Sequence, residues 1–345
     1  MNWRSFGHSG LKVTELCLGT MTLSGQADAK ASYTILDTAY EGGIRFLDTA
    51  DCYPVPMKLA TAGDTERLVG RWLAERGIRD EFVLATKAYF PAGGLPIQRG
   101  NSRLHLTRAC EASLRRLGTD RLDLYLCHGW DATVPLEETL YALEDLRRSG
   151  KIVYAGVSNV RSHELAKALI ASERLGVRGF EGIQPRYNLL QREAEESLFP
   201  VAEDFGLGTM VYNPIAGGLL SGKYVPGAEP PPGTRFALAG VSETYRRRYW
   251  DDRFLEAAAE LKRVAAKHGI SLVTAAVAWV LSNPNVSSAI IGASKPEQLA
   301  DHLRATQMQM PDVLEERINR VWYELPRRLP ELDTPRIPDF YTVVS

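Results

Sequence analysis

The chain has 345 residues, of which 45% are hydrophobic, and it carries 41 basic and 42 acidic side chains. This composition excludes a disordered protein, which has few apolar residues and a large net charge. A net charge of −1 predicts no attraction to nucleic acid or to an anionic membrane. The four cysteines form no C-x-x-C pair and the N-terminal residues lack the apolar core of a signal peptide, so we expect free thiols and a cytoplasmic protein.

The chain begins with a predicted hairpin and continues with a regular alternation of strands and helices. Apolar residues flank His8-Ser9-Gly10, which predicts two short strands that close one end of the fold. Stretches such as 106–117 and 136–146 have apolar residues three and four positions apart, which predicts helices. Eight apolar runs predict strands at 16–20, 45–49, 82–87, 122–128, 152–158, 181–184, 208–214 and 288–292.

This alternation indicates the fold class. Eight strands separated by helices predict one (α/β)8 barrel domain across residues 1–345, although an open, doubly wound parallel sheet has the same pattern. Residues 225–251 interrupt the alternation with four prolines and several glycines, so we expect a long loop there and no helix. Since the functional loops of a barrel follow its strands, and this loop follows the seventh strand, we expect it to be functional.

Several common motifs are missing, and their absence narrows the chemistry. The first strand leads into Gly19-Thr20-Met21 and not into the G-x-G-x-x-G of a dinucleotide-binding loop. The sequence also lacks the P-loop, the H-E-x-x-H zinc motif and the G-x-S-x-G nucleophile motif. No two histidines are spaced four residues apart, so we expect no metal centre.

Four ionisable residues end or follow three successive predicted strands. Asp48 ends the second strand and Tyr53 follows it, Lys87 ends the third, and His128 ends the fourth. The carboxyl ends of barrel strands meet at one face, so these side chains are expected to converge. A tyrosine beside a lysine ammonium is a tuned proton donor, while an aspartate holds the lysine and a histidine binds the substrate oxygen.

Each of these residues also has a structural interpretation. Asp48 is a candidate helix cap, Tyr53 a rim aromatic, Lys87 a salt-bridge partner and His128 a satisfied interior side chain. Their joint order along the chain favours a catalytic group over four unrelated structural roles. A barrel hydrolase or aldolase that uses Lys87 as a Schiff base is a remote enzymatic alternative.

Six segments, in order along the chain, resemble one known family. They are 43–50 with Tyr53, 123–128, 156–159, 184–190, 212–224 and 291–299. These segments resemble the motifs of the aldo-keto reductases, which are NAD(P)-dependent carbonyl reductases built on an (α/β)8 barrel. The Tyr53-Pro54-Val55-Pro56 sequence before Glu66 resembles the Tas-like branch, which is related to the potassium-channel β-subunits.

The resemblance implies an enzyme that reduces a carbonyl compound. Tyr53 would be the general acid, and Asp48, Lys87 and His128 would complete the catalytic tetrad. The partner implied is a small-molecule aldehyde or ketone, for example a sugar or another natural-product carbonyl, and the oligomeric state stays open. The alternative is an NADP(H)-sensing binding subunit of the channel-β type with little turnover.

The resemblance also implies a binding site for NADPH. Ser158, Asn159 and Gln184 would hold the nicotinamide amide, Tyr212 would stack on its ring, and Arg235 would close over the pyrophosphate from the proline-rich loop. The other implied cofactor-binding residues lie in four segments of the chain: Thr20 and Met21 in the first; Asn213, Pro214, Ile215, Ala216, Gly217, Leu219, Ser221 and Lys223 in the second; Gly292, Ser294 and Lys295 in the third; and Gln298, Asp301 and His302 in the last.

One feature bears on the choice between the two nicotinamide cofactors. A lysine and a hydroxyl at Lys295 and Ser294, with no acidic residue to hold a free 2′-hydroxyl, favour NADPH over NADH.

The sequence departs from the family pattern at two places. Pro54 stands where a glycine usually follows the tyrosine, and Asp301-His302 stands where the family usually has Glu-Asn. The first departure affects the loop after Tyr53 and the second affects contacts to the adenine, while the tetrad is unchanged.

Overall fold

The computed structural model describes residues 1–326, so residues 327–345 of the predicted domain lie outside the described residues. Eight parallel strands close into a barrel in the order β10-β3-β4-β5-β6-β7-β8-β9, and β1 and β2 form a separate antiparallel pair. The strands are β1 (Trp3–Ser5), β2 (Lys12–Thr14), β3 (Leu16–Gly19), β4 (Phe46–Asp48), β5 (Val83–Ala88), β6 (Leu122–Cys127), β7 (Ile152–Ser158), β8 (Gly182–Gln184), β9 (Gly208–Val211) and β10 (Ser288–Ile291).

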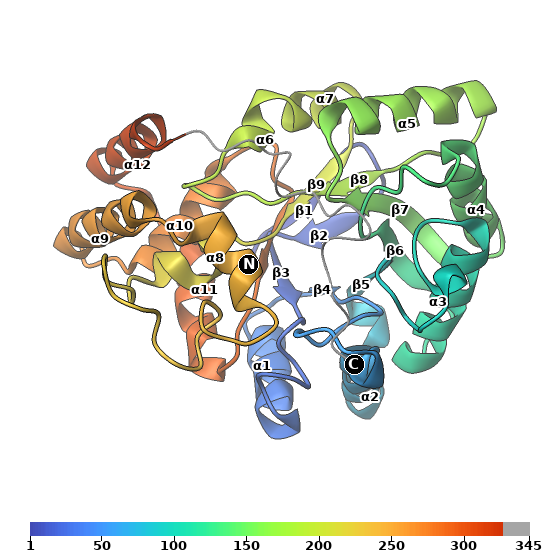
Figure 1. Ribbon diagram of the computed structural model, residues 1–345, viewed down its shortest axis with the longest axis horizontal. Coiled ribbons are helices and arrows are strands. Elements are labelled where there is room, and N and C mark those ends of the chain that lie inside the picture. The colour runs from blue at the N-terminus through green and yellow to red at the C-terminus, as the bar shows by residue number, and fades with distance from the viewer. Residues whose placement is uncertain (327–345) are drawn as a thin grey trace.

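The helices surround these strands (Figure 1). They are α1 (Ala29–Glu41), α2 (Asp64–Arg76), α3 (Arg103–Leu117), α4 (Leu136–Arg148), α5 (Ser162–Leu175), α6 (Glu193–Glu196), α7 (Leu198–Asp204), α8 (Ser242–Tyr249), α9 (Asp252–Lys267), α10 (Leu272–Ser282), α11 (Leu299–Ala305) and α12 (Asp312–Glu324). The predicted (α/β)8 barrel is therefore confirmed, and the open-sheet alternative is wrong. All eight predicted barrel strands are present, with ends that differ by up to three residues.

The N-terminal hairpin closes the bottom of the barrel, as its position ahead of the first barrel strand predicts. Trp3 pairs with Thr14, and Phe6, which follows β1, is fully buried among side chains from the barrel interior. A Cβ atom at Gly182 would lie 2.4 Å from the Phe6 ring, and one at Gly208 would lie 2.3 Å from it. Both strands therefore need glycine where the ring enters the barrel.

One prediction about the long loop is wrong. Residues 225–251 were expected to contain no helix, but α8 forms at Ser242–Tyr249. The four prolines all lie between 226 and 232, so they do not reach the helical segment, which contains neither proline nor glycine. The buried side chains of Tyr245, Arg248 and Tyr249 hold α8 against the barrel.

Within residues 1–326, no single helix is long and apolar enough to cross a membrane. The helices α9 and α10 pass the length and composition test only as a pair, and they are bent by 94° at the break between them.

Candidate active site

The carboxyl ends of the barrel strands place a buried ion pair at the centre of the site. Asp48 ends β4 and Lys87 lies near the end of the adjacent strand β5, so both side chains point toward the same end of the barrel. Lys87 Nζ lies 2.7 Å from Asp48 Oδ2 and donates a second bond of 2.7 Å to the Thr49 carbonyl. Thr20 fixes the Asp48 backbone, because its N–H and its hydroxyl both donate to the Asp48 carbonyl.

Tyr53 lies in the loop after β4, above this ion pair. Lys87 Nζ lies 5.1 Å from the centre of the Tyr53 ring, and the ring of His128 lies 5.9 Å from it at an interplanar angle of 79°. The four residues predicted as a tetrad are thus brought together from three neighbouring strands. An ammonium at this position favours the phenolate of a tyrosine, so the arrangement suits Tyr53 for proton transfer.

His128 is held as a neutral imidazole. Burial, and secondarily the charge of Lys87, place the pKa of His128 well below its usual value. The His128 ring packs edge-on against Phe90 at 4.8 Å, and its Nδ1 lies 4.0 Å from the Cys52 sulfur. The His128 carbonyl accepts a 2.8 Å bond from Asn159 Nδ2. A neutral imidazole can donate one hydrogen bond to a substrate oxygen without adding a second cation beside Lys87.

The residues expected to hold a nicotinamide form one connected group. Ser158 Oγ donates to the Gln184 carbonyl at 2.8 Å, and Tyr212 OH donates to Asn159 Oδ1 at 2.8 Å. Asn159 has a φ of +53°, in the left-handed region that asparagine tolerates better than most residues. Gln184 Nε2 donates to Asp48 Oδ1 at 2.8 Å, so Gln184 joins this group to the catalytic ion pair.

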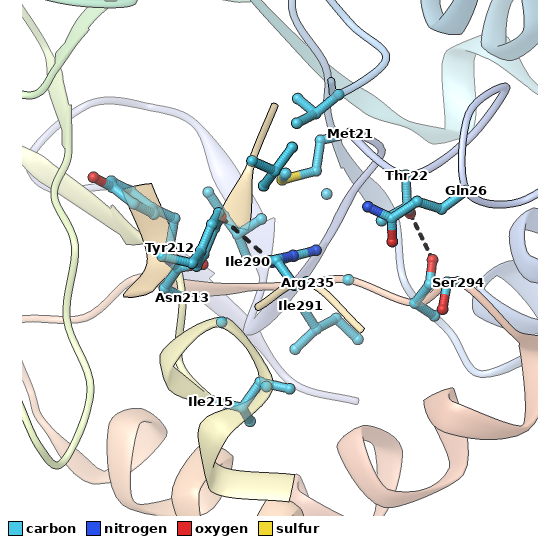
Figure 2. Close-up of a pocket in the computed structure, with 18 of the residues that line it drawn as sticks. Met21, Thr22, Gln26, Tyr212, Asn213, Ile215, Arg235, Ile290, Ile291 and Ser294 are labelled. Carbon is cyan, nitrogen blue, oxygen red and sulfur yellow. Dashed lines mark hydrogen bonds between the residues drawn. The ribbon is translucent and has the colours of Figure 1, made fainter. Parts of the chain in front are cut away.

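A cavity of about 420 Å³ extends from Tyr53 and His128 to the residues after β10. In the view of Figure 2, Tyr212 and Asn213 lie on one side of it, Ser294 lies on the other, and Arg235 lies between them. Lys87, Ala216, Leu219 and Lys295 are absent from its wall. The predicted residues that line it are Thr20, Met21, Asp48, Tyr53, His128, Ser158, Asn159, Gln184, Tyr212, Asn213, Pro214, Ile215, Gly217, Ser221, Lys223, Arg235, Gly292, Ser294, Gln298, Asp301 and His302.

The middle of the cavity is cationic. Lys223 and Arg235 both line it, and burial together with the Arg235 charge lowers the pKa of Lys223. The Arg235 guanidinium lies 5.0 Å from the centre of the Tyr245 ring. Burial raises the pKa of Tyr245, but Arg235 and Arg248 outweigh that effect, so this pKa lies below its usual value. Two like charges held close together in a partly buried wall suit an anionic ligand.

The far end of the cavity is polar but carries less charge. Gln298 Oε1 accepts bonds from the backbone N–H groups of Ser294 at 2.9 Å and Lys295 at 3.2 Å, so it fixes the turn before α11. Burial lowers the pKa of His302 to about 4, so this imidazole is neutral at pH 7. Asp301 lines the cavity and forms a 3.0 Å ion pair with Arg304.

The cavity fits an extended polar cofactor such as a nicotinamide dinucleotide. Its volume lies in the range of small-molecule sites, and its wall combines an aromatic ring at Tyr212, the cations Lys223, Arg235 and Arg248, and many polar groups. Two of the wall residues, Gln26 and Ser221, hold buried polar atoms (Nε2 and Oγ) that have no hydrogen-bond partner. Buried polar groups without partners are costly, so a polar ligand that reached them would be stabilised.

Comparison with known proteins gives the family. The model of the Aldo/keto reductase family matches residues 15–322. The chain belongs to the aldo/keto reductase family. The predicted resemblance is therefore confirmed over nearly the whole chain, including its relation to the Tas and channel-β branch of the family.

Three relatives illustrate that branch. The chain is 37% identical to the uncharacterized oxidoreductase YrpG of Bacillus subtilis (strain 168), over 93% of this chain and 96% of that protein. It is 34% identical to a probable voltage-gated potassium channel subunit beta of Oryza sativa subsp. japonica, over 95% and 98%. It is 33% identical to the Protein tas of Escherichia coli (strain K12), over 92% and 96%.

The sequence prediction for this aldo/keto reductase missed part of the cavity wall. Two of the missed residues, Tyr245 and Arg248, lie three positions apart on α8, in the segment that was expected to contain no helix. Had that helix been recognised, the spacing would have placed both on one face. Thr244 lies on α8 as well, one turn before Arg248, and Val273 lies on α10. No spacing signal marks a further six residues, because they reach the cavity from loops: Thr22, Gln26, Val55, Met57, Phe90 and Val241.

Proposed function

We propose that this protein reduces an aldehyde or ketone by hydride transfer from NADPH, with Tyr53 as the general acid. The observation that carries this proposal is the position of Tyr53. Its ring lies at one end of the cavity, 5.1 Å from Lys87 Nζ and 5.9 Å from the His128 ring. A carbonyl oxygen near Tyr53 and His128 would face two hydrogen-bond donors, which is what reduction at the carbonyl carbon requires.

The residues of the chain have separate tasks in this chemistry. NADPH, when bound, supplies the hydride. The stack on Tyr212 and the amide contacts of Ser158 and Asn159 would orient the ring so that one face is open to the substrate. Tyr53 gives a proton to the carbonyl oxygen, while Lys87, held by Asp48, stabilises the phenolate that Tyr53 becomes.

The middle of the cavity suits the pyrophosphate of a nicotinamide dinucleotide, and the residues at the far end favour NADPH. Lys223 and Arg235 are placed to neutralise phosphate charge, and Ser294 offers a hydroxyl near the expected ribose. Lys295 is exposed and lies outside the cavity wall, so we propose that it meets a 2′-phosphate from the solvent side.

The substrate end of the cavity favours an uncharged carbonyl compound. Around Tyr53, the wall is built from the side chains of Met21, Val55, Met57 and Phe90. Of the cations in the wall, Lys223 and Arg235 belong to the cofactor segments, and Arg248 lies 5.8 Å from the centre of the Tyr245 ring, which Arg235 also contacts. Lys87 is paired with Asp48. A carboxylate or phosphate on the substrate would therefore have no counter-ion beside Tyr53, and we propose a neutral substrate with an apolar substituent.

The test is NADPH oxidation followed by absorbance, with a panel of aldehydes, ketones and keto-sugars. We expect Tyr53→Phe to lower turnover by about 10²–10⁴-fold while NADPH affinity, measured by fluorescence titration, stays within about twofold. Tyr141→Phe, which removes a hydroxyl from the exposed face of α4, is the matched control. Wild-type turnover in Tyr53→Phe would contradict the proposed mechanism.

A second candidate function has support from the comparisons. Relatives that cover almost the whole chain are named as probable channel β-subunits, so a cofactor-sensing binding subunit is the alternative. Tight NADPH binding without turnover across the panel would favour it. Its direct test is whether the affinity for a captured partner differs between the NADP⁺-bound and NADPH-bound protein.

A further inference from the structure

Asp51 is a buried carboxyl group to which the proposed chemistry gives no task. Only 2% of the residue is exposed, and neither of its carboxyl oxygens has a well-formed hydrogen bond. Its backbone N–H donates to the Lys87 carbonyl at 3.0 Å, so Asp51 is fixed to the strand that carries the catalytic lysine. A buried carboxylate without donors is strongly unfavourable, which is the first sign that Asp51 holds a proton.

A second buried carboxyl, that of Glu66 on α2, acts on the same region and is fully partnered. Thr86 Oγ1 donates to Glu66 Oε1 at 2.6 Å, and Arg116 Nε lies 2.5 Å from Oε2. Glu66 is completely buried, whereas 18% of the Arg116 side chain is exposed. Glu66 therefore has the counter-ion and donors that Asp51 lacks.

The charges of the region balance without Asp51. Asp48 pairs with Lys87 and Glu66 pairs with Arg116, so an ionised Asp51 would leave one uncompensated buried negative charge. Burial, and then the charge of Glu66, raise the pKa of Asp51 well above its usual value, against the smaller effects of Arg116, Lys87 and the Cys52 backbone N–H.

The remaining titratable neighbours leave this balance unchanged. Burial raises the pKa values of Cys52, Cys110 and Tyr125, so these three groups are uncharged at pH 7.

We propose that Asp51 and Glu66, which contact the neighbouring residues Lys87 and Thr86 of β5, act as one positioning pair that holds a single negative charge and a single proton. Arg116 keeps the charge on Glu66, and Asp51 keeps the proton. The pair sets the electrostatic field at Lys87, and through Lys87 it sets the readiness of Tyr53 to give up its proton. Neither carboxyl lines the cavity, so both act through other residues and are not catalytic.

This role makes the two carboxyls mutually replaceable. In Glu66→Gln, Arg116 loses its counter-ion, and Asp51 is expected to release its proton and become the negative group. In Asp51→Asn, an already neutral group is replaced by a neutral one of the same size. Only the double variant leaves Arg116 without a carboxylate, and its added positive charge favours the phenolate of Tyr53.

Infrared spectroscopy tests whether Asp51 is protonated, and it requires no turnover. Its result is therefore independent of the proposed function. The link from the pair to Tyr53 rests on that function. We expect the wild type to show the C=O band of a protonated carboxylic acid at pH 7. That band should be lost in Asp51→Asn and also in Glu66→Gln. A band that persists in Asp51→Asn, or is missing from the wild type, overturns the proposal.

The pH profile of kcat/KM tests the effect on Tyr53. Both single variants should keep the wild-type midpoint of the alkaline limb, whereas the double variant should lose activity at a pH lower by on the order of half to one unit. Asp64→Asn, which neutralises an exposed carboxyl on the same helix as Glu66, should leave the profile unchanged. A shifted midpoint in Asp51→Asn alone, or no shift in the double variant, contradicts the pair. Should the double variant fail to fold, the infrared result on the single variants decides.

Discussion

Gln184 Nε2 donates a 2.8 Å hydrogen bond to Asp48 Oδ1, although the two residues are 136 positions apart in the chain. Because Lys87 occupies the other carboxylate oxygen, Asp48 is paired on both sides by buried groups. The nicotinamide-side residue Gln184 and the catalytic ion pair are therefore one hydrogen-bonded unit. A change at Gln184 should affect the tetrad as well as the cofactor.

Gln184→Glu tests this connection. The substitution puts a second carboxyl against Asp48, and like charges this close cannot both ionise without cost. We expect the variant to unfold more easily than the wild type at pH 7, by about 1–3 kcal/mol, because a buried donor is lost and a like charge is gained. Since a proton shared by the two carboxyls relieves the repulsion, the difference should shrink at pH 5. Urea denaturation at both pH values measures it, and an equal difference at both would contradict the contact.

The cations in the middle of the cavity should govern cofactor affinity. Replacing Lys223 or Arg235 by Met removes positive charge from the cavity wall and should weaken NADPH binding by about 10–100-fold, with a smaller dependence on salt concentration. Arg253→Gln removes a cation from the exposed start of α9 and serves as the matched control. Titration of NADPH fluorescence at low and high salt is the measurement, and equal affinities in Arg235→Met and the control would refute this role.

The packing of Phe6 at the bottom of the barrel predicts a stability effect far from the cavity. Gly208→Ala would bring a methyl group to 2.3 Å from the Phe6 ring and should destabilise the protein by about 1–3 kcal/mol through overpacking. Combining it with Phe6→Leu should restore part of the loss, because the smaller side chain makes room. Gly10→Ala, whose methyl group would meet only the Tyr154 hydroxyl at 3.5 Å, is the control. Unfolding midpoints in urea decide between these outcomes.

Acid should destabilise this protein through its buried histidines. Burial lowers the pKa of His105 and of His302 to about 4, and the pKa of His128 lies well below its usual value. In the unfolded chain these histidines bind protons as the pH falls below about 6.5, whereas in the folded protein they stay neutral until the pH is much lower. The free energy of unfolding therefore falls as the pH drops from about 6.5 toward 4, by up to about 1.4 kcal/mol per pH unit for each histidine.

Variants separate this effect from general acid denaturation. His105→Gln should flatten the fall in stability between pH 7 and 5, whatever its effect at pH 7. The exposed His163 is the control, because His163→Gln should leave the slope as in the wild type. A slope that His105→Gln does not change would argue against a neutral buried imidazole at this position.

Much of the fold and the centre of the site could be predicted because both depend on order along the chain. Asp48 ends β4, Lys87 is the last residue but one of β5, and His128 directly follows β6; parallel strands of a barrel bring these ends to one face. Continuous apolar runs located those strands, because strands of a barrel are buried on both faces.

The rest of the site lies mostly in loops, whose conformation leaves no periodic pattern in the sequence. Gln26 and Met57 reach the cavity from loops, and Tyr245 does so from a short helix close to a proline cluster that predicted none. Lys295 follows the family motif yet lies outside the cavity wall, because the turn held by Gln298 directs it to solvent. Loop conformation, which is set by such individual hydrogen bonds, decided these positions.

The pairing of β10 with β3 has a consequence for synthesis of the chain. Ala289 pairs with Leu16, and Ser288 Oγ donates to the Thr14 carbonyl, so the seam of the barrel joins segments made at opposite ends of translation. Until β10 has been synthesised, β3 and β9 each have an edge of unpaired backbone groups. Such edges recruit strands from other chains. Newly made chains should therefore depend on chaperones for longer than those of a protein whose strands pair with their neighbours in sequence.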